Sequence, residues 1–162
     1  SHALNLNATT AQTDKSGNGT LLRPTATTFS TNYTDGLNVN TKLFIAYCWH
    51  SVEGYSKFGS YTGNGGADGA FVYTGFKPAW IVVKASSAVG AWFIFDNKRL
   101  GYNPKTYRLI ADTTDAEADP GDFDILSNGF KLRFTSSNAN GGGVTYIYAA
   151  FAEMPMKYAT AR

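Results

Sequence analysis

Short apolar runs separated by turn residues fill the chain from residue 42 onward, and this pattern constrains the fold more than any other feature of the sequence. The runs are rich in Val, Ile, Tyr, Phe and Trp, which favour strands, and Gly, Asn, Asp and Pro stand between them. Helical periodicity is nearly absent. The pattern predicts strands at 42–49, 54–61, 71–76, 79–84, 91–96, 107–111, 123–126, 129–134 and 144–151.

Several of these runs are apolar on both faces, as in Ala91-Trp92-Phe93-Ile94-Phe95, where both alternating sets of side chains are hydrophobic. A strand with one wet face alternates between apolar and polar residues, so these strands need cover on both sides. We therefore expect an all-β fold, an antiparallel β-sandwich of about nine strands that is jelly-roll-like. The second face of a sheet then lies against another sheet or another subunit.

Turn residues punctuate the pattern at defined places. Ser127-Asn128-Gly129 lies between two apolar runs and predicts a tight hairpin. Pro78 fits only at the first position of a strand, because it cannot donate to the ladder. The glycine-rich stretch 63–68 precedes a strand, which makes it a flexible hairpin loop and not a phosphate-binding loop.

Residues 1–41 differ from the rest, because they are rich in Thr and Asn and their apolar residues occur singly. Such a stretch buries little apolar area by itself, so it either stays mobile or lies against something else. The chain starts at Ser1 without a methionine, which indicates a piece of a longer protein. We expect two parts: an arm over 1–41 and a β-sandwich domain over 42–162.

Composition excludes several classes of protein. The net charge is only +2 and charged residues are 16% of the chain, which argues against a nucleic-acid partner. The apolar runs are too short for a membrane helix, so no membrane insertion is expected. Cys48 is the single cysteine, which excludes an internal disulfide and a multi-cysteine metal site. No cofactor motif is present, and Cys48 is expected to be a small buried hydrophobe.

Five blocks occur in order and together carry a resemblance: FIAYCWHSVEGYSKFGSYTGNGG (44–66), FVYTGFKPAWIVVK (71–84), WFIFDNKR (92–99), LSNGFKLR (126–133) and YIYAAFAEMPMKY (146–158). This pattern resembles a domain at the C-terminus of tail-fibre-like and virion structural proteins of bacteriophages. The resemblance covers about residues 40–162 and has no catalytic signature attached. It implies an extracellular fibre tip, a homotrimer that contacts a cell surface, on a virion tail fibre or a bacterial surface fibre. Residues 1–41 would be the neck that joins the tip to the shaft.

Aromatic and polar side chains in the segment 96–107 are the best ligand-binding candidates. Sugar-binding surfaces use Trp and Tyr rings as flat platforms beside amide, carboxylate or guanidinium groups. The segment supplies these groups through Asp96, Asn97, Arg99, Tyr102, Asn103 and Tyr107. Lys98 and Lys105 extend the expectation to anionic glycans. Trp49, Trp80 and Trp92 lie inside predicted strands, which favours the core or a subunit contact for them.

Catalytic and metal sites are less well supported. His50, Ser51 and Glu53 are too close together on an extended strand to form a relay, because their side chains point alternately to opposite faces. The acidic stretch 112–124 has oxygen ligands at alternate positions, but Pro120 and Leu126 stand where a calcium loop needs a flexible turn and a glutamate. We expect a solvated loop and no metal.

The sequence therefore predicts a non-enzymatic, receptor-binding tip of a trimeric fibre that recognises a cell-surface glycan. Trimerisation would cover the apolar second faces and would strengthen weak single sites through effective concentration. A structural capping or decorating domain with no ligand is the alternative. A glycan-degrading enzyme is the third reading, and it would need paired carboxylates across a groove.

Overall fold

A computed structural model describes residues 2–14, 23–30, 39–99, 103, 107–118 and 123–153. Every regular element in these ranges is a strand, and none of them contains a helix that is long and apolar enough to cross a lipid bilayer. The strands are β1 (His2–Ala3), β2 (Thr13–Asp14), β3 (Arg23–Pro24), β4 (Phe29–Ser30), β5 (Ser56–Thr62), β6 (Phe71–Tyr73), β7 (Pro78–Ala85), β8 (Trp92–Asp96), β9 (Arg108–Ile110), β10 (Phe123–Leu126), β11 (Gly129–Leu132) and β12 (Thr145–Ala152).

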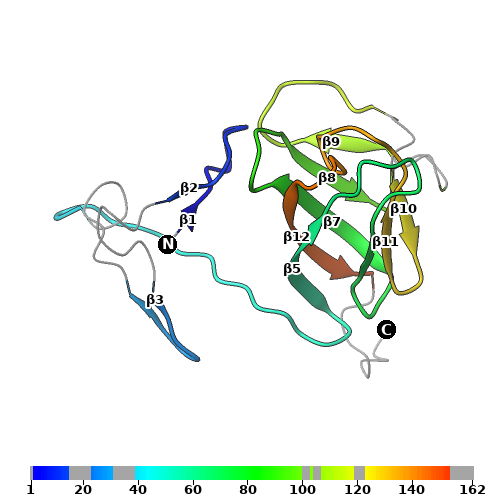
Figure 1. The fold of residues 1–162 in the computed structure, drawn as a ribbon. Coiled ribbons are helices and arrows are strands. Elements are labelled where there is room, and N and C mark those ends of the chain that lie inside the picture. The colour runs from blue at the N-terminus through cyan, green and yellow to red at the C-terminus, as the bar shows by residue number, and fades with distance from the viewer. Residues whose placement is uncertain are drawn as a thin grey trace.

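Two antiparallel sheets form the body of the protein (Figure 1). The larger sheet has the order β5-β12-β7-β8-β9, and the smaller has the order β10-β11-β6. Two further pairs, β1 with β2 and β3 with β4, are two-residue ladders in the N-terminal arm. The fold is thus an all-β, antiparallel sandwich, which confirms the fold class expected from the sequence.

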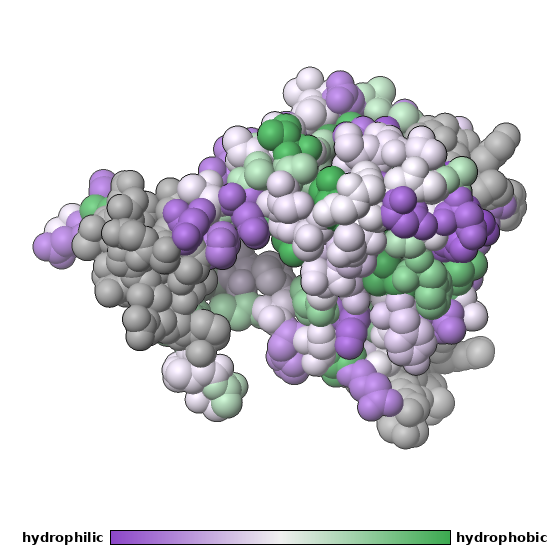
Figure 2. All heavy atoms as spheres, viewed as in Figure 1, coloured by the Kyte–Doolittle hydropathy of each residue, from purple (hydrophilic) through white to green (hydrophobic). Residues whose placement is uncertain are grey.

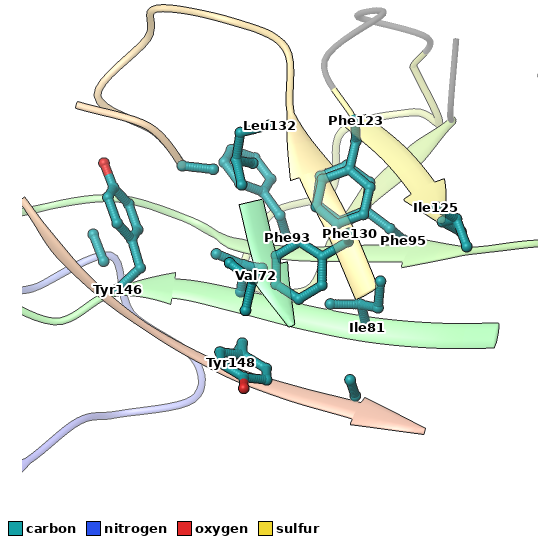
Figure 3. Packing of buried hydrophobic residues seen from close by; sticks show 14 residues of the cluster. Val72, Ile81, Phe93, Phe95, Phe123, Ile125, Phe130, Leu132, Tyr146 and Tyr148 are labelled. Carbon is teal, nitrogen blue, oxygen red and sulfur yellow. The ribbon is translucent and has the colours of Figure 1, made fainter. Parts of the chain in front are cut away.

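The hydrophobic core lies between the two sheets. The five-stranded sheet contributes buried residues at alternate positions, such as Ile81 and Val83 in β7 and Phe93 and Phe95 in β8. The small sheet contributes Phe123, Ile125, Phe130 and Leu132. Figure 3 shows these side chains meeting from both sides. The rings of Phe95 and Phe123 stack with centroids 4.0 Å apart, so an aromatic contact joins the two sheets directly.

The structure confirms two sequence predictions, one of a hairpin turn and one of a strand start. Leu126 pairs with Gly129, so Ser127 and Asn128 form the two-residue loop of the β10–β11 hairpin. At Gly129 a Cβ would stand 2.1 Å from the carbonyl oxygen of Val72, so only glycine lets β11 pair with β6 this closely. Pro78 is the first residue of β7, as its missing N–H requires.

The glycine-rich stretch 63–68 is not a hairpin loop, contrary to the expectation. It connects β5 in the large sheet with β6 in the small sheet. The Asn140 side chain holds it, because Asn140 Oδ1 accepts from Asn64 N at 3.1 Å and Nδ2 lies 2.9 Å from Gly66 O. The segment is therefore a hydrogen-bonded crossover between sheets, which local composition did not indicate.

The predicted strand at 42–49 does not form. No described residue forms a backbone hydrogen bond with Leu43–Trp49, and the segment is irregular although its residues favour strands. A strand needs a neighbouring ladder, and β5, which follows the segment, pairs with β12 instead. The expectation that Cys48 is buried is also wrong, because this residue is exposed. Trp49 is exposed as well and does not join the core.

The N-terminal arm extends away from the sandwich and touches the large sheet through backbone atoms (Figure 1). Lys84 is fully buried at this contact, and its Nζ donates to the carbonyl oxygens of Thr9 (3.3 Å), Thr10 (3.0 Å) and Ala85 (2.6 Å). Desolvation lowers the pKa of Lys84. Trp92 Nε1 donates to Asn5 O at 3.0 Å. The arm therefore covers one end of the outer face of the large sheet.

Alkaline pH should destabilise the fold through Tyr61, whose hydroxyl donates to Ala139 O at 2.7 Å. Burial raises the pKa of Tyr61 well above its usual value, and the nearby Tyr146 adds to the shift. A folded-state pKa above the unfolded value gives stability that is present below pH 10 and is lost as the pH rises through the folded pKa. We expect the free energy of unfolding, measured by urea titration, to fall above pH 10.

The Tyr61→Phe variant is the control for this effect. It loses one hydrogen bond, which costs about 1 kcal/mol at neutral pH, but it has no proton to release. Its stability should therefore fall less steeply above pH 10 than that of the parent. An equal slope in both proteins would assign the alkaline loss to other groups.

Candidate functional site

An open cavity of about 530 Å³ lies at one end of the large sheet. The start of β7, the end of β8 and the end of β12 meet there, because antiparallel pairing places Trp80 beside both Asp96 and Phe151. The cavity is lined by Ala79, Trp80, Asp96, Asn97, Lys98, Arg99, Ala152 and Glu153. Strand ends thus position every lining residue except those of the turn after β8 and Glu153, which directly follows β12.

Asp96 shapes that turn. Its Oδ1 accepts hydrogen bonds from the backbone N–H groups of Lys98 and Arg99, both at 2.9 Å. Its Oδ2 accepts from Arg99 Nε at 2.7 Å. The backbone N–H of Asn97 donates to Ala79 O at 3.0 Å, which ties the turn to β7. An aspartate that caps its own turn in this way fixes the backbone around the cavity.

The charged groups of the cavity are paired with one another. Lys98 Nζ lies 2.5 Å from Glu153 Oε1, and Arg99 pairs with both Asp96 and Glu117. A hydrogen bond and the charge of Lys98 lower the pKa of Glu153. The hydrogen bond from Arg99 to Glu117 raises the pKa of Arg99. Two acidic and two basic residues line the cavity, so their formal charges sum to zero.

An aromatic ring and an unpaired amide oxygen complete the cavity. The Trp80 side chain is 37% exposed and packs against the Phe151 ring at a centroid distance of 5.6 Å. Asn97 Oδ1 is buried and has no hydrogen-bond partner among the described residues. A buried acceptor without a partner is costly, and such groups are usually satisfied by water or a ligand. The cavity thus combines an apolar platform with an amide whose buried oxygen lacks a partner among the described residues.

Three of the six residues predicted to bind a ligand line this cavity, namely Asp96, Asn97 and Arg99. Asn103 has a different set of contacts, because its side-chain amide bonds to the backbone N and O of Ile125 at 2.9 and 2.7 Å. It anchors its loop to β10. Tyr107 is half-buried just before β9 and is not among the lining residues. Tyr102 and Lys105 lie outside the described residues.

The predicted ligand-binding residues did not include Trp80, which was assigned to the core or a subunit contact, or Glu153, which was considered only as a carboxylate for the glycan-degrading alternative. Trp80 alternates with the buried residue Ile81 along β7, so it belongs to the outer face of the sheet. Trp92 is on the same outer face and is half-buried. No local pattern set Trp80 apart, because residues 79–83 are apolar at every position, and the 73 positions between Trp80 and Glu153 hide their meeting as well.

The polar residues considered for a catalytic or metal site form hydrogen bonds and ion pairs within the fold. Ser51 Oγ accepts from Phe58 N at 3.0 Å, and the His50 ring bonds to Ser51 O at 3.0 Å. Asp112 Oδ1 accepts from Trp92 N, and Asp124 pairs with Arg133 at 2.5 Å. Within the described ranges, no group of three or more metal-ligating side chains is present. Asp119 and Asp122 are outside those ranges.

Comparison with curated proteins gives no match, and comparison with solved structures gives none. A family model described as "Domain of unknown function (DUF7483)" matches residues 1–155. The match takes in the N-terminal arm, both sheets and every residue that lines the cavity. This chain therefore belongs to the DUF7483 family.

Proposed function

We propose that this protein is the receptor-binding tip of a trimeric extracellular fibre, phage-like or bacterial, and that it holds a cell-surface glycan in the cavity without transforming it. The observation that carries the proposal is the meeting of Trp80 with Asp96, Asn97 and Glu153 around one open cavity. The fibre context rests on the sequence resemblance described above, and the glycan rests on the chemistry of the lining residues.

A sugar ring has an apolar C–H face and a rim of hydroxyl groups. The exposed part of Trp80 offers a flat apolar surface to such a face. The amide of Asn97 and the carboxylates of Asp96 and Glu153 offer hydrogen-bonding groups at the rim. A hydroxyl group of the ligand that reaches the buried Asn97 Oδ1 would give this acceptor the partner it lacks among the described residues.

The charge balance favours a neutral glycan over the anionic one that Lys98 and Lys105 suggested. Lys98 is already paired with Glu153, and Arg99 is already paired with two carboxylates. An anionic sugar would have to displace one of these partners. Hydroxyl groups can add to the existing network without breaking it, because a carboxylate accepts several hydrogen bonds.

The two acidic groups in the cavity favour binding of a glycan over its hydrolysis. A glycosidase needs one carboxyl group that stays protonated near neutral pH to act as the general acid. Lys98 lowers the pKa of Glu153, which is the opposite of what that role needs. Asp96 is occupied by its own turn and by Arg99.

A structural capping or decorating domain is the second candidate function, and one observation favours it. Among the described residues, the largest group of exposed aromatic side chains in one segment is Phe44, Tyr47 and Trp49, which lies before β5 and is not part of the cavity lining. Aromatic residues exposed in this way are typical of protein–protein contacts. In that case the domain would bind other proteins of a fibre or virion and no glycan.

Removing the Trp80 ring should weaken glycan binding by about tenfold or more, because central aromatic side chains dominate such contacts. The measurement is a screen of neutral and anionic glycans on an array, followed by calorimetric titration of the best ligand with the parent and Trp80→Ala. Asn97→Ala should also weaken binding, because it removes the free acceptor.

Tyr73→Ala is the matched control, since it removes an exposed aromatic ring from β6 on the other sheet. It should bind the glycan like the parent. Failure of every glycan to bind at millimolar concentration would overturn the proposal and leave the structural function. Release of a shortened sugar during incubation would contradict the absence of catalysis.

A further inference from the structure

An apolar row crosses the outer face of the large sheet and has no cover in the described part of the chain. Pairing register aligns five side chains from edge to edge, in the order Phe58, Ala149, Val82, Ile94 and Leu109. Each of them is only half-buried, although each is apolar. On the face of the sandwich seen in Figure 2, hydrophobic and polar residues are mixed.

The rows of side chains on either side of this row have contacts of their own that do not extend over it. On one side the N-terminal arm covers the next row, where Lys84 bonds to Thr9 and Thr10. On the other side lies the row of Trp80 and Asp96, which lines the cavity. The uncovered row is therefore a band between two occupied regions, and we call it the apolar row.

The segment 42–50 supplies a complementary surface. Its alternate residues Leu43, Ile45, Tyr47 and Trp49 are 101%, 81%, 74% and 65% exposed. In an extended chain such residues share one face, and Tyr47 and Trp49 indeed stack with centroids 6.1 Å apart. Leu43–Trp49 contains no charged residue, and neither does the apolar row. Contact between them would bury apolar area without desolvating an ion.

The length of the extended segment also matches the length of the apolar row. From Leu43 to Trp49 an extended chain spans about 20 Å at roughly 3.3 Å per residue. The apolar row crosses five strands, which at about 4.8 Å between neighbours is roughly 19 Å. A segment lying across the strands would therefore reach from Phe58 to Leu109, in the near-perpendicular arrangement that packed β-layers adopt.

The segment does not cover the row of its own chain. Its C-terminal end is held at β5, where Ser56 Oγ donates to His50 O and Phe58 N donates to Ser51 Oγ, both at 3.0 Å. From there the chain runs to the N-terminal arm, apart from the sheet (Figure 1). Leu43 is fully exposed, so it touches no part of the apolar row.

We infer that the occupant of the apolar row is a second copy of this chain: Leu43–Trp49 of one copy packs on the apolar row of its neighbour. Because every copy carries both surfaces, each can give its segment to one neighbour and accept the segment of another, which closes into a ring when the rotation allows. The inference rests on the self-association included in the proposed function but does not depend on the glycan.

Solution mass tests the inference. The 162-residue chain should form a species heavier than 17.5 kDa by light scattering coupled to size exclusion. Leu43→Asp together with Ile45→Asp should raise the dissociation constant by more than about tenfold and return the mass to 17.5 kDa. Both residues are exposed, so the far-UV circular dichroism should stay unchanged, and Tm should fall only by the stabilisation that assembly gives the parent. Val89→Asp, at an apolar position that is 69% exposed in the β7–β8 loop, is the control and should keep the parent mass.

Cross-linking tests which surfaces meet. Cys48 is the only cysteine, so the parent can be mixed with a Cys48→Ser, Ala149→Cys variant and treated with a short bismaleimide. A covalent pair between the two proteins is expected. A monomer at every concentration would overturn the inference, and so would a multimer whose mass the segment variant does not change. Links between Cys48 residues alone would assign the contact to two segments and would also overturn it. Glycan titration of the segment variant tests the cavity separately, since that variant leaves the cavity intact.

Discussion

Phe130→Ala should lower the free energy of unfolding by about 3–5 kcal/mol, the usual cost of removing a large aromatic side chain from a core. Phe130 is fully buried in β11 and joins the two sheets. Its ring stacks on Phe123 at 5.0 Å and meets the edges of Tyr148 at 5.4 Å and Tyr61 at 6.1 Å. Domains of this size are stable by roughly 5–15 kcal/mol, so the variant approaches unfolding.

Urea denaturation followed by far-UV circular dichroism measures this loss. Phe71→Ala is the matched control, because it removes the same side chain from β6, where the ring is about half exposed. That substitution should cost about 1 kcal/mol or less. Equal losses in the two variants would show that Phe130 does not hold the sheets together.

Asn140→Ala should lower the free energy of unfolding by about 2–5 kcal/mol, because it removes a fully buried amide and leaves several part-buried polar groups without their partner. Asn140 is fully buried. Its Oδ1 accepts from Asn64 N, and its Nδ2 lies 2.8–2.9 Å from Asn64 Oδ1, Gly66 O and Phe134 O. An alanine has no group that could replace any of these bonds.

Hydrogen exchange gives a local readout of the same change. The amide of Asn64 should exchange faster in Asn140→Ala, since its acceptor is gone, while amides of β7 and β12 should lose protection only as far as global stability falls. Asn138→Ala, at an exposed position in the same turn, should leave both stability and Asn64 exchange near the parent values. Unchanged Asn64 exchange in Asn140→Ala would contradict the role assigned to the amide.

Strand positions could be predicted from the sequence because residues within a few positions of one another specify them. Eight of the nine predicted strands overlap observed ones, and β10 has the predicted bounds. Runs of β-branched and aromatic residues between turn residues mark the strands, and Asn128-Gly129 and Pro78 mark a turn and a strand start. The strand at 42–49 failed although its local preference is strong, because a strand also needs a partner and no described segment supplies one.

The candidate site could be predicted only in part from the sequence. Asp96, Asn97 and Arg99 were identified because they share one turn, and local composition is enough to find such a cluster. Trp80 and Glu153 reach the cavity from β7 and the end of β12, so their role depends on strand order. Asn103 and Tyr107 have the right chemistry for a sugar site, but Asn103 is bonded to Ile125 and Tyr107 lies outside the cavity lining.

By itself the sequence determined the all-β class, the positions of the strands from residue 54 onward and the apolar character of both faces of several strands. These properties follow from the residue types within a few positions of one another. Only the tertiary structure decided which strands are neighbours, that 63–68 crosses between sheets and that Trp80 and Glu153 share a cavity. Such contacts join residues that are distant in the chain, and the free energy that selects them comes from packing and hydrogen bonds formed only in the folded state.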